Sequence, residues 1–480
     1  MEYRVNLLSS LGYPDTDDVL AAARVRAKGR PSPDAALLAR RNVQHLLRTH
    51  LPSHRYAVLE RVGRVADAQE VSAYVVGGGV RDLLLGSRNL DCDMVVEGDG
   101  IAFARALAQQ EGARVRTSAR FGTAVVLLPD GCKVNVATAR AEYYEYPTAF
   151  PTVAQSSIKQ DLYRRDFTIN TLAIRLNARG FGELLDFYGG QRDLKDKTLR
   201  VLHSCSFVDD PARVFRAVRF AVRFGFRLGK ETLTLLKGAV KMDLFQRLSG
   251  ARLCEELRLL LGEPETRRAV ARLAELDLLR FIQAEISWSP QLDRLLKSVD
   301  DVLAWHRVAS LNWPIHARRP RGMREQRTDQ IKPWLVRLIA LLDALSDTAV
   351  REVLQRLSLG GQHTATVQTA RAARHLLPRL AHQPPPAETY RLLAGQRLES
   401  VLFLLAKATS KAVQQQIASY LDTFRYMQPR LSGHDLHAMG CTPGPRFRTI
   451  LHRLLEARLN GEVTTEAEER ALGRQLVNGQ

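Results

Sequence analysis

Residues 74–98 read YVVGGGVRDLLLGSRNLDCDMVVEG, and the fold of the surrounding chain follows from them. An apolar strand runs into three glycines, a short helix carries Arg81 and Asp82, and a second strand contains Asp91 and Asp93. Side chains two residues apart on a strand point to the same face, so the last two carboxylates would lie side by side. Like charges this close are unfavourable unless a cation lies between them. The stretch therefore predicts a divalent metal site beside a glycine turn, whose backbone N–H groups suit phosphates.

Short β-branched runs surround this stretch and alternate with one helical segment. The runs are AYVVG (73–77), DMVVEG (93–98), TAVVLLP (123–129) and KVNVAT (133–138), and the helical segment is IAFARALAQQEGA (101–113). Residues 129–131, Pro-Asp-Gly, predict a hairpin between two of the runs. Asn135 lies on the last run, where a neighbouring strand could carry a third metal-binding group. We expect a small mixed α/β sheet that extends to about residue 200.

After residue 202 the strand patterns end and the sequence is strongly helical. Residues 209–228 read DDPARVFRAVRFAVRFGFRL, and their arginines at 213, 216, 219 and 223 lie along one stripe of a helix. Asp209 and Asp210 open this helix, where carboxylates suit its cap and its dipole. Apolar residues fill most of the remaining helix surface, so we expect the arginine stripe to face a specific group. The rest of the chain reads as helix upon helix, without a repeat period.

The chain's charge indicates its partner. It has 480 residues, too many for one compact core, with 70 Lys plus Arg against 51 Asp plus Glu, which gives a net charge of +19. Such an excess favours nucleic acid, although a solvated basic surface or an anionic membrane is an alternative. The five cysteines are scattered without metal-ligand spacing, and neither a signal peptide nor a membrane span is evident. We therefore expect a soluble, cytoplasmic protein with no membrane partner; no pattern sets its oligomeric state.

Four motifs, in this order, resemble the class II tRNA nucleotidyltransferases and the bacterial poly(A) polymerases. They are Gly77-Gly78-Gly79-Val80-Arg81-Asp82, Asp91-Cys92-Asp93, Arg164-Arg165-Asp166-Phe167-Thr168-Ile169-Asn170 and Asp209-Asp210-Pro211-Ala212-Arg213. The resemblance covers residues 73–261 and, more loosely, the chain up to residue 310. It implies an α+β fold, in which an N-terminal polymerase-β-like mixed-sheet nucleotidyltransferase head is followed by an all-α neck, body and tail.

The resemblance also implies domain boundaries. The expected domains are a helical N-terminal extension (1–66), the nucleotidyltransferase head (67–200), a helical neck with the nucleobase-selecting motif (201–262), a helical body (263–383) and a helical, RNA-binding tail (384–480). The last boundary coincides with the proline run QPPPAE at 383–388.

The family's roles are carried over residue by residue. Asp91 and Asp93 would be catalytic and would hold Mg²⁺, which activates the primer 3′-hydroxyl and binds the incoming triphosphate. The residues expected at the triphosphate are Gly77, Gly78, Arg81, Arg164 and Arg165. The nucleobase would be selected by Asp210 and Arg213, because a carboxylate and a guanidinium together can satisfy the edge of cytosine or adenine. The expected supporting residues are Asp82, Asp166, Asn170, Arg216 and Arg219.

Three features of this chain bear on the activity. Asn135 stands where many relatives carry an acidic residue; it can coordinate a metal or form a hydrogen bond through its carbonyl, but it adds no charge. Asp209 stands where Glu is common, and a helix-capping role is as well supported for it as a functional one. The long aromatic segment at 141–163 occupies the place of a loop linked in the family to addition of the final A, so it disfavours an enzyme limited to adding CC.

We therefore expect template-independent, Mg²⁺-dependent addition of CMP and AMP, from CTP and ATP, to the 3′ end of tRNA, which builds or repairs CCA. The closest alternatives are a poly(A) polymerase and an enzyme that adds only CC or only A. A non-catalytic RNA-binding protein is an alternative of another class, but the intact motifs argue against it.

Overall fold

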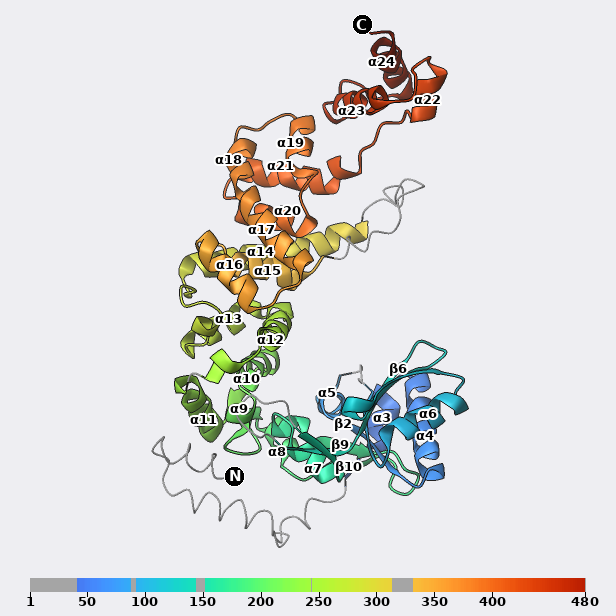
Figure 1. Cartoon of the computed structure of the whole chain (residues 1–480), viewed down its shortest axis with the longest axis vertical. Coiled ribbons are helices and arrows are strands. Elements are labelled where there is room, and N and C mark those ends of the chain that lie inside the picture. The colour runs from blue at the N-terminus through green and yellow to red at the C-terminus, as the bar shows by residue number, and fades with distance from the viewer. Residues whose placement is uncertain (1–40, 88–91, 144–151, 243, 313–330, 480) are drawn as a thin grey trace. The chain divides into compact units, whose positions relative to one another are not determined.

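The computed structural model describes residues 41–87, 92–143, 152–242, 244–312 and 331–479. The chain forms two compact units, Met1–Leu248 and Ser249–Gln480 (Figure 1). Their boundary falls inside the segment 201–262 that the sequence predicts as a neck. The predicted domain limits themselves stay predictions. Most of the helical extension predicted at 1–66, up to residue 40, lies outside the described residues.

The first unit is built on one mixed sheet of eight strands in the order β1-β10-β9-β2-β3-β6-β5-β4. The strands are β1 (Arg41–Asn42), β2 (Ser72–Val76), β3 (Asp93–Glu97), β4 (Arg114–Ser118), β5 (Thr123–Leu127), β6 (Lys133–Thr138), β9 (Leu172–Arg175) and β10 (Glu183–Asp186). Only the β3–β6 pair is parallel; the other neighbours are antiparallel. The mixed sheet that the sequence predicts is therefore confirmed, as is the β5–β6 hairpin.

Helices pack around this sheet and continue beyond it. The α-helices of the first unit are α3 (Gln44–His50), α4 (Ser53–Ala68), α5 (Gly78–Leu84), α6 (Gly100–Gln110), α7 (Ile158–Tyr163), α8 (Gly190–Lys195), α9 (Ser206–Asp209), α10 (Ala212–Phe224) and α11 (Lys230–Lys241). Helix α6 packs against β3, β4, β5 and β6, and α4 packs against α6 and β2. Asp99 begins α6, because its carboxylate accepts hydrogen bonds from the N–H groups of Ile101 and Ala102.

Several short elements were not expected from the sequence. Strands β7 (Arg140–Tyr143) and β8 (Thr152–Gln155) form a separate ribbon. Strand β11 (Thr198–Leu199) pairs with β12 (Arg227–Leu228), so strands do not end at residue 202. Short 3-10 turns, among them η2 (Ala119–Phe121), η3 (Thr168–Asn170) and η4 (Leu244–Arg247), join the larger elements. These pieces have too few residues to display a periodic apolar pattern.

The second unit is helical throughout its described residues. Its α-helices are α12 (Gly250–Gly262), α13 (Thr266–Glu275), α14 (Pro290–Asn312), α15 (Pro333–Leu341), α16 (Asp347–Arg356), α17 (Gly361–Ala372), α18 (Leu376–Ala381), α19 (Pro386–Leu393), α20 (Leu398–Lys407), α21 (Lys411–Asp422), α22 (Gly433–Ala438), α23 (Pro445–Leu459) and α24 (Glu466–Asn478). Three of them, α14, α15 and α20, pack on one another, and every residue of α15 from Trp334 to Leu341 is buried.

The last three helices have a small core of their own. Leu431, Leu436, Ile450, Leu454 and Val477 gather in one apolar cluster between them. Capping boxes begin α22 at Ser432 and α24 at Thr465. Together with the head sheet, this helical second half confirms the predicted α+β fold class. No helix among the described residues has the length and apolar character needed to cross a bilayer.

The close approach of α12 to the end of α16 predicts that a side chain at Gly250 would destabilise the second unit. A Cβ atom on Gly250, the first residue of α12, would lie 1.9 Å from the carbonyl oxygen of Arg356. Gly250→Ala should therefore destabilise the second unit by about 1–3 kcal/mol through overpacking. All four tryptophans, at 288, 305, 313 and 334, belong to this unit, so the tryptophan fluorescence of urea-unfolding curves reports on it.

Gly361→Ala is the matched control, because Gly361 is also the first residue of its helix and a Cβ there meets nothing within 4 Å. It should leave stability unchanged or raise it by up to about 1 kcal/mol. Equal stabilities of the two variants would contradict the close approach.

Candidate active site

The glycine turn follows β2 directly. Gly77 has φ +73°, a conformation that favours glycine, and α5 begins at the next residue. A Cβ atom on Gly77 would lie 2.5 Å from Nη1 of Arg165. The absence of a side chain at this position thus lets the guanidinium of Arg165 lie against the backbone of the turn. Two of the residues predicted to bind the triphosphate are therefore neighbours in space.

Arg81 on α5 is buried, and its guanidinium is held within the protein. Its Nε and Nη2 atoms each lie 2.8 Å from the Oδ1 atom of Asp82, and its Nη1 donates to Oδ1 of Asn170 at 2.6 Å. The guanidinium also lies over the ring of Phe224, 4.6 Å from the centroid. Arg81 thus links α5 to η3 and α10. Its predicted contact with the triphosphate stays a prediction.

Asn170 continues this chain of hydrogen bonds to α10. Its Nδ2 donates to Oδ1 of Asp166 at 2.8 Å, and Nη1 of Arg216 donates to the other oxygen of Asp166 at 3.2 Å. Burial raises the pKa of the Asp166 carboxyl, but Arg216, Asn170 and Arg213 outweigh it and hold that pKa below its ordinary value. Four of the predicted supporting residues, Asp82, Asp166, Asn170 and Arg216, thus belong to one network. We call it the Asp166 network; it also includes Arg81.

Arg219, the fifth predicted supporting residue, is buried one turn further along α10. Its guanidinium lies 4.8 Å from the centroid of the Phe220 ring. Phe220 packs edge-on against Phe167, which follows Asp166 in the chain. Arg219 therefore supports the packing of α10 on the residues that hold the Asp166 network.

The Arg164-Arg165 pair is organised by a carboxylate that the motif comparison did not single out. Asp161, on α7 and fully buried, accepts from Arg164 at 2.7 Å and from Arg165 at 3.0 Å. Burial raises the pKa of Asp161, yet the two guanidinium groups outweigh it and lower the pKa overall. Arg164 also donates to Glu142 on β7 at 2.8 Å. The spacing of three and four residues between Asp161 and the arginines is the signal in the sequence that indicates this contact.

Asp210 and Arg213 lie at the junction of α9 and α10. The helix that carries the arginine stripe begins at Ala212, so Asp209 ends α9 rather than opening the longer helix. Oδ1 of Asp210 accepts from the N–H of Ala212 at 3.0 Å, and Nε of Arg213 lies 3.8 Å from Oδ2 of Asp210. That separation is longer than a direct hydrogen bond.

Arg213 links this junction to the Arg164-Arg165 pair. Its Nη2 donates to the carbonyl oxygen of Arg164 at 2.8 Å, and its Nη1 donates to Oγ of Ser206 at 2.8 Å. Both Arg213 and Asp210 are buried. The fourth motif therefore directly contacts the third, although Arg213 and Arg164 are 49 residues apart in the sequence.

Asp93 begins β3 and is exposed. Its partner in the parallel register of β3 and β6 is Asn135, whose Nδ2 donates to Oδ1 of Asp93 at 2.9 Å. Asn135 thus orients the carboxylate. Asp91, the other predicted metal ligand, lies outside the described residues. An exposed carboxylate of this kind is a ligand that Mg²⁺ favours, so Asp93 fits a metal site.

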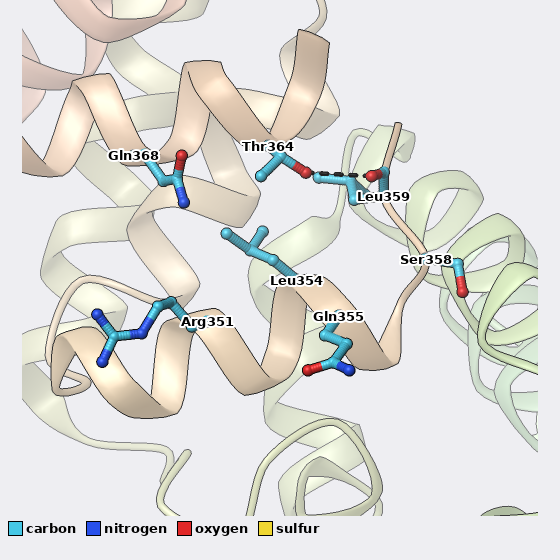
Figure 2. A pocket seen from close by; sticks show the side chains of 7 residues that line it. All are labelled: Arg351, Leu354, Gln355, Ser358, Leu359, Thr364 and Gln368. Atoms are coloured by element: carbon cyan, nitrogen blue, oxygen red, sulfur yellow. Dashed lines mark hydrogen bonds between the residues drawn. The ribbon is translucent and has the colours of Figure 1, made fainter. Parts of the chain in front are cut away.

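The second unit contains a separate open pocket between α16 and α17. It is lined by Arg351, Leu354, Gln355, Ser358, Leu359, Thr364 and Gln368 (Figure 2). The hydroxyl of Thr364 donates to the carbonyl oxygen of Leu359 at 3.1 Å, as the dashed line in Figure 2 shows. The lining contains one charged side chain and no carboxylate, so it does not hold the residue types that a metal-dependent transfer needs.

Comparison with known proteins agrees with this geometry. Residues 73–200 match the family described as Poly A polymerase head domain. The solved structure of the Thermotoga maritima CCA-adding enzyme complexed with tRNA_CCA is similar, with a TM-score of 0.67 and 31% identity over 90% of this chain and 98% of that one. The chain belongs to the class II tRNA nucleotidyltransferases. The family resemblance that the sequence motifs indicate is thereby confirmed.

Curated relatives within this family differ in length. The A-adding tRNA nucleotidyltransferase of Geobacter sulfurreducens is 42% identical over 452 residues, which are 92% of this chain and 49% of that protein. The A-adding tRNA nucleotidyltransferase of Halalkalibacterium halodurans is 29% identical over 444 residues, 91% of this chain and 96% of that protein. The chain thus spans about half the length of the Geobacter relative.

The buried charge of Asp166 gives a prediction that depends on pH. Asp166→Asn should destabilise the first unit by about 2 kcal/mol at pH 7, because it removes the charge that faces Arg216. The folded-state pKa lies below the ordinary 3.8, so this stabilisation is complete above about pH 5 and is lost as the pH falls through the folded-state value. The difference between wild type and variant should therefore shrink towards pH 3.

Because the tryptophans lie in the other unit, this comparison is best made by hydrogen exchange of peptides from 158–224 in increasing urea. Asp196→Asn, at an exposed carboxylate, is the control and should match wild type. If Asp166→Asn is as stable as wild type at pH 7, the Asp166 charge does not stabilise the first unit. If the loss of stability is the same at pH 3 as at pH 7, the loss does not come from that charge.

Proposed function

We propose that this protein is a template-independent, Mg²⁺-dependent nucleotidyltransferase that adds AMP from ATP to tRNA ending in CC. The observation that carries the proposal is the contact between Arg213 and the Arg164 carbonyl. It joins Arg213, which with Asp210 would select the base, to the Arg164-Arg165 pair, which would bind the triphosphate. Such an arrangement lets protein groups, rather than a nucleic-acid template, choose the nucleotide.

The names of the relatives favour addition of the terminal A alone over addition of the full CCA sequence. The Geobacter and Halalkalibacterium proteins, which align with more than nine-tenths of this chain, are both named A-adding enzymes. Full CCA addition from CTP and ATP, which the sequence motifs alone predict, is the second candidate. The similarity to the Thermotoga CCA-adding enzyme along nearly all of that chain supports it.

Each group of residues has a task in this proposal. Asp93, with Asp91, would hold Mg²⁺, which lowers the pKa of the primer 3′-hydroxyl and neutralises phosphate charge. Gly77, Gly78, Arg164 and Arg165 would bind the triphosphate. Asp161 binds both guanidinium groups and so limits their movement, and the Asp166 network would hold α10 beside the base. Asn135 would keep one oxygen of Asp93 in place without adding a third negative charge.

The helical second unit would bind the rest of the tRNA. A net charge of +19 suits the phosphates of a folded RNA, whose backbone is easier to reach than its base edges. The Thermotoga enzyme was solved with tRNA bound, and the similarity to it spans both units of this chain. The cytoplasmic location predicted from the sequence stays a prediction.

One assay separates the candidates. Three tRNA substrates, ending at the discriminator base, at C and at CC, are each incubated with Mg²⁺ and with ATP, CTP or both. A-addition predicts one AMP on the CC substrate and no incorporation of CTP into the shorter ones. Stepwise CTP then ATP incorporation that stops at CCA establishes the second candidate instead. A long A tail on unrelated RNA indicates a poly(A) polymerase, and no incorporation at all indicates a non-catalytic RNA-binding protein.

Asp93→Ala tests the metal site. It should lower AMP incorporation at least about a thousandfold, because the metal that stabilises the transferring phosphoryl group loses a ligand. The affinity for tRNA, measured by fluorescence anisotropy, should stay within about twofold of wild type. Asp196→Ala should change neither quantity. If Asp93→Ala retains turnover, the carboxylate is not catalytic; if it abolishes tRNA binding, the role is structural.

A further inference from the structure

Among the described residues, one face of the sheet in the first unit is exposed along β4, β5 and part of β6, whereas α7 packs on the same face at Val95 of β3. Helix α6 covers the other face of β3, β4, β5 and β6. Along β5 the residues that point towards α6, Ala124 and Val126, are buried, whereas Val125 and Leu127 are 37% and 38% exposed. Apolar side chains with this exposure in the middle of a sheet lose contact with water only when a partner covers them.

The strand register sets the side chains of this face in rows. Asp93 pairs with Asn135, Asn135 with Val125, and Val125 with Arg116. Residues paired across neighbouring strands point to the same face, so a single row runs from Asp93 across three strand intervals to the edge strand. At about 4.8 Å per interval, this row is about 14 Å long.

A second row beside it is basic and apolar. Lys133 pairs with Leu127, and Leu127 pairs with Arg114. Both basic residues are exposed, as is Arg116 in the first row. Among the residues that the structure describes, none of these three cations forms an ion pair. At the end of β4, Phe121 is 44% exposed, and the guanidinium of Arg120 lies 5.4 Å from its ring centroid.

Protection of the sheet edge does not account for this charge. Arginines on an edge strand such as β4 do discourage a further strand from pairing there. Lys133, however, lies on β6, which has a neighbour on both sides. The positive charges therefore extend into the sheet, towards Asp93, which is the pattern expected if an anionic chain follows the rows.

We propose that this open face of β4, β5 and β6 binds the 3′ strand of the RNA substrate and leads its end to Asp93. Arg114, Arg116 and Lys133 would contact successive phosphates, while Val125 and Leu127 pack against the sugars and bases. The proposal rests on the proposed function for the identity of the RNA. It adds a docking surface on the head, distinct from the proposed base-selecting pair, Asp210 and Arg213.

The test compares two double variants that remove the same charge. Arg114→Gln with Arg116→Gln changes the open face. Arg64→Gln with Arg105→Gln changes exposed positions on α4 and α6, the helices on the covered side. Binding of tRNA ending in CC to the full-length protein is measured by anisotropy at several salt concentrations without nucleotide. The KM values for tRNA and for ATP are measured separately.

The open-face variant should bind tRNA about tenfold more weakly at moderate salt, and the slope of log K against log salt should become less steep by about 1.4 for two single-strand phosphate contacts. Its KM for tRNA should rise while its KM for ATP stays unchanged. The α4–α6 variant should change the slope and both KM values little.

Equal losses in the two variants mean that only net charge matters and overturn the proposal, as does wild-type binding by the open-face variant. A failure of the proposed function is distinguishable, because it appears in the wild-type protein as absence of nucleotide incorporation. In that case the binding comparison still decides whether this face binds RNA.

Discussion

The buried carboxylate of Asp166 is the constraint on which the rest of the first unit depends. It lies between η3 and α10, and burial alone would favour its neutral form. Arg216 compensates the charge from α10, while Asn170 donates to it and accepts from Arg81 on α5. One set of hydrogen bonds therefore fixes the glycine turn relative to α10. A buried ion pair of this type contributes less to net stability than to a defined geometry, and loss of one partner leaves a costly charge.

Around this network, the residues that would hold the nucleotide are bound to other protein groups, whereas the residue that would hold the metal is exposed to solvent. Arg164 and Arg165 share the fully buried Asp161, and Arg213 is bound to the Arg164 backbone. Asp93 in contrast is exposed and contacts Asn135. This difference agrees with their proposed tasks: base selection needs a fixed edge, whereas a metal and a primer must enter and leave at each turnover.

The sequence predicts the parts of this fold that carry long apolar patterns. Without a structure one can recognise the α6 helix and the β-branched runs that form β2, β3, β5 and β6. The parallel register of β3 and β6 confirms that a neighbouring strand carries Asn135 beside Asp93. Strand β4 (RVRTS) lacks that pattern because its polar residues outnumber its single valine, and β10 (ELLD) lacks it because it has only two apolar residues between two carboxylates. Asp161 lies outside the quoted motifs, so only its spacing from the arginines indicates it. The internal contacts of Arg81 depend on Phe224, which the chain brings close only through tertiary folding.

In the proposed mechanism, Asp210 and Arg213 choose the nucleotide. The most direct measurement is the ratio of kcat/KM for ATP to that for CTP on tRNA ending in CC. The ratio should fall at least about tenfold in Arg213→Ala, because one good base-edge pair discriminates by about 1–3 kcal/mol. Asp210→Asn should change the same ratio, and Arg223→Ala, on the last turn of α10, should preserve it. A wild-type ratio in active Arg213→Ala and Asp210→Asn proteins would contradict the account.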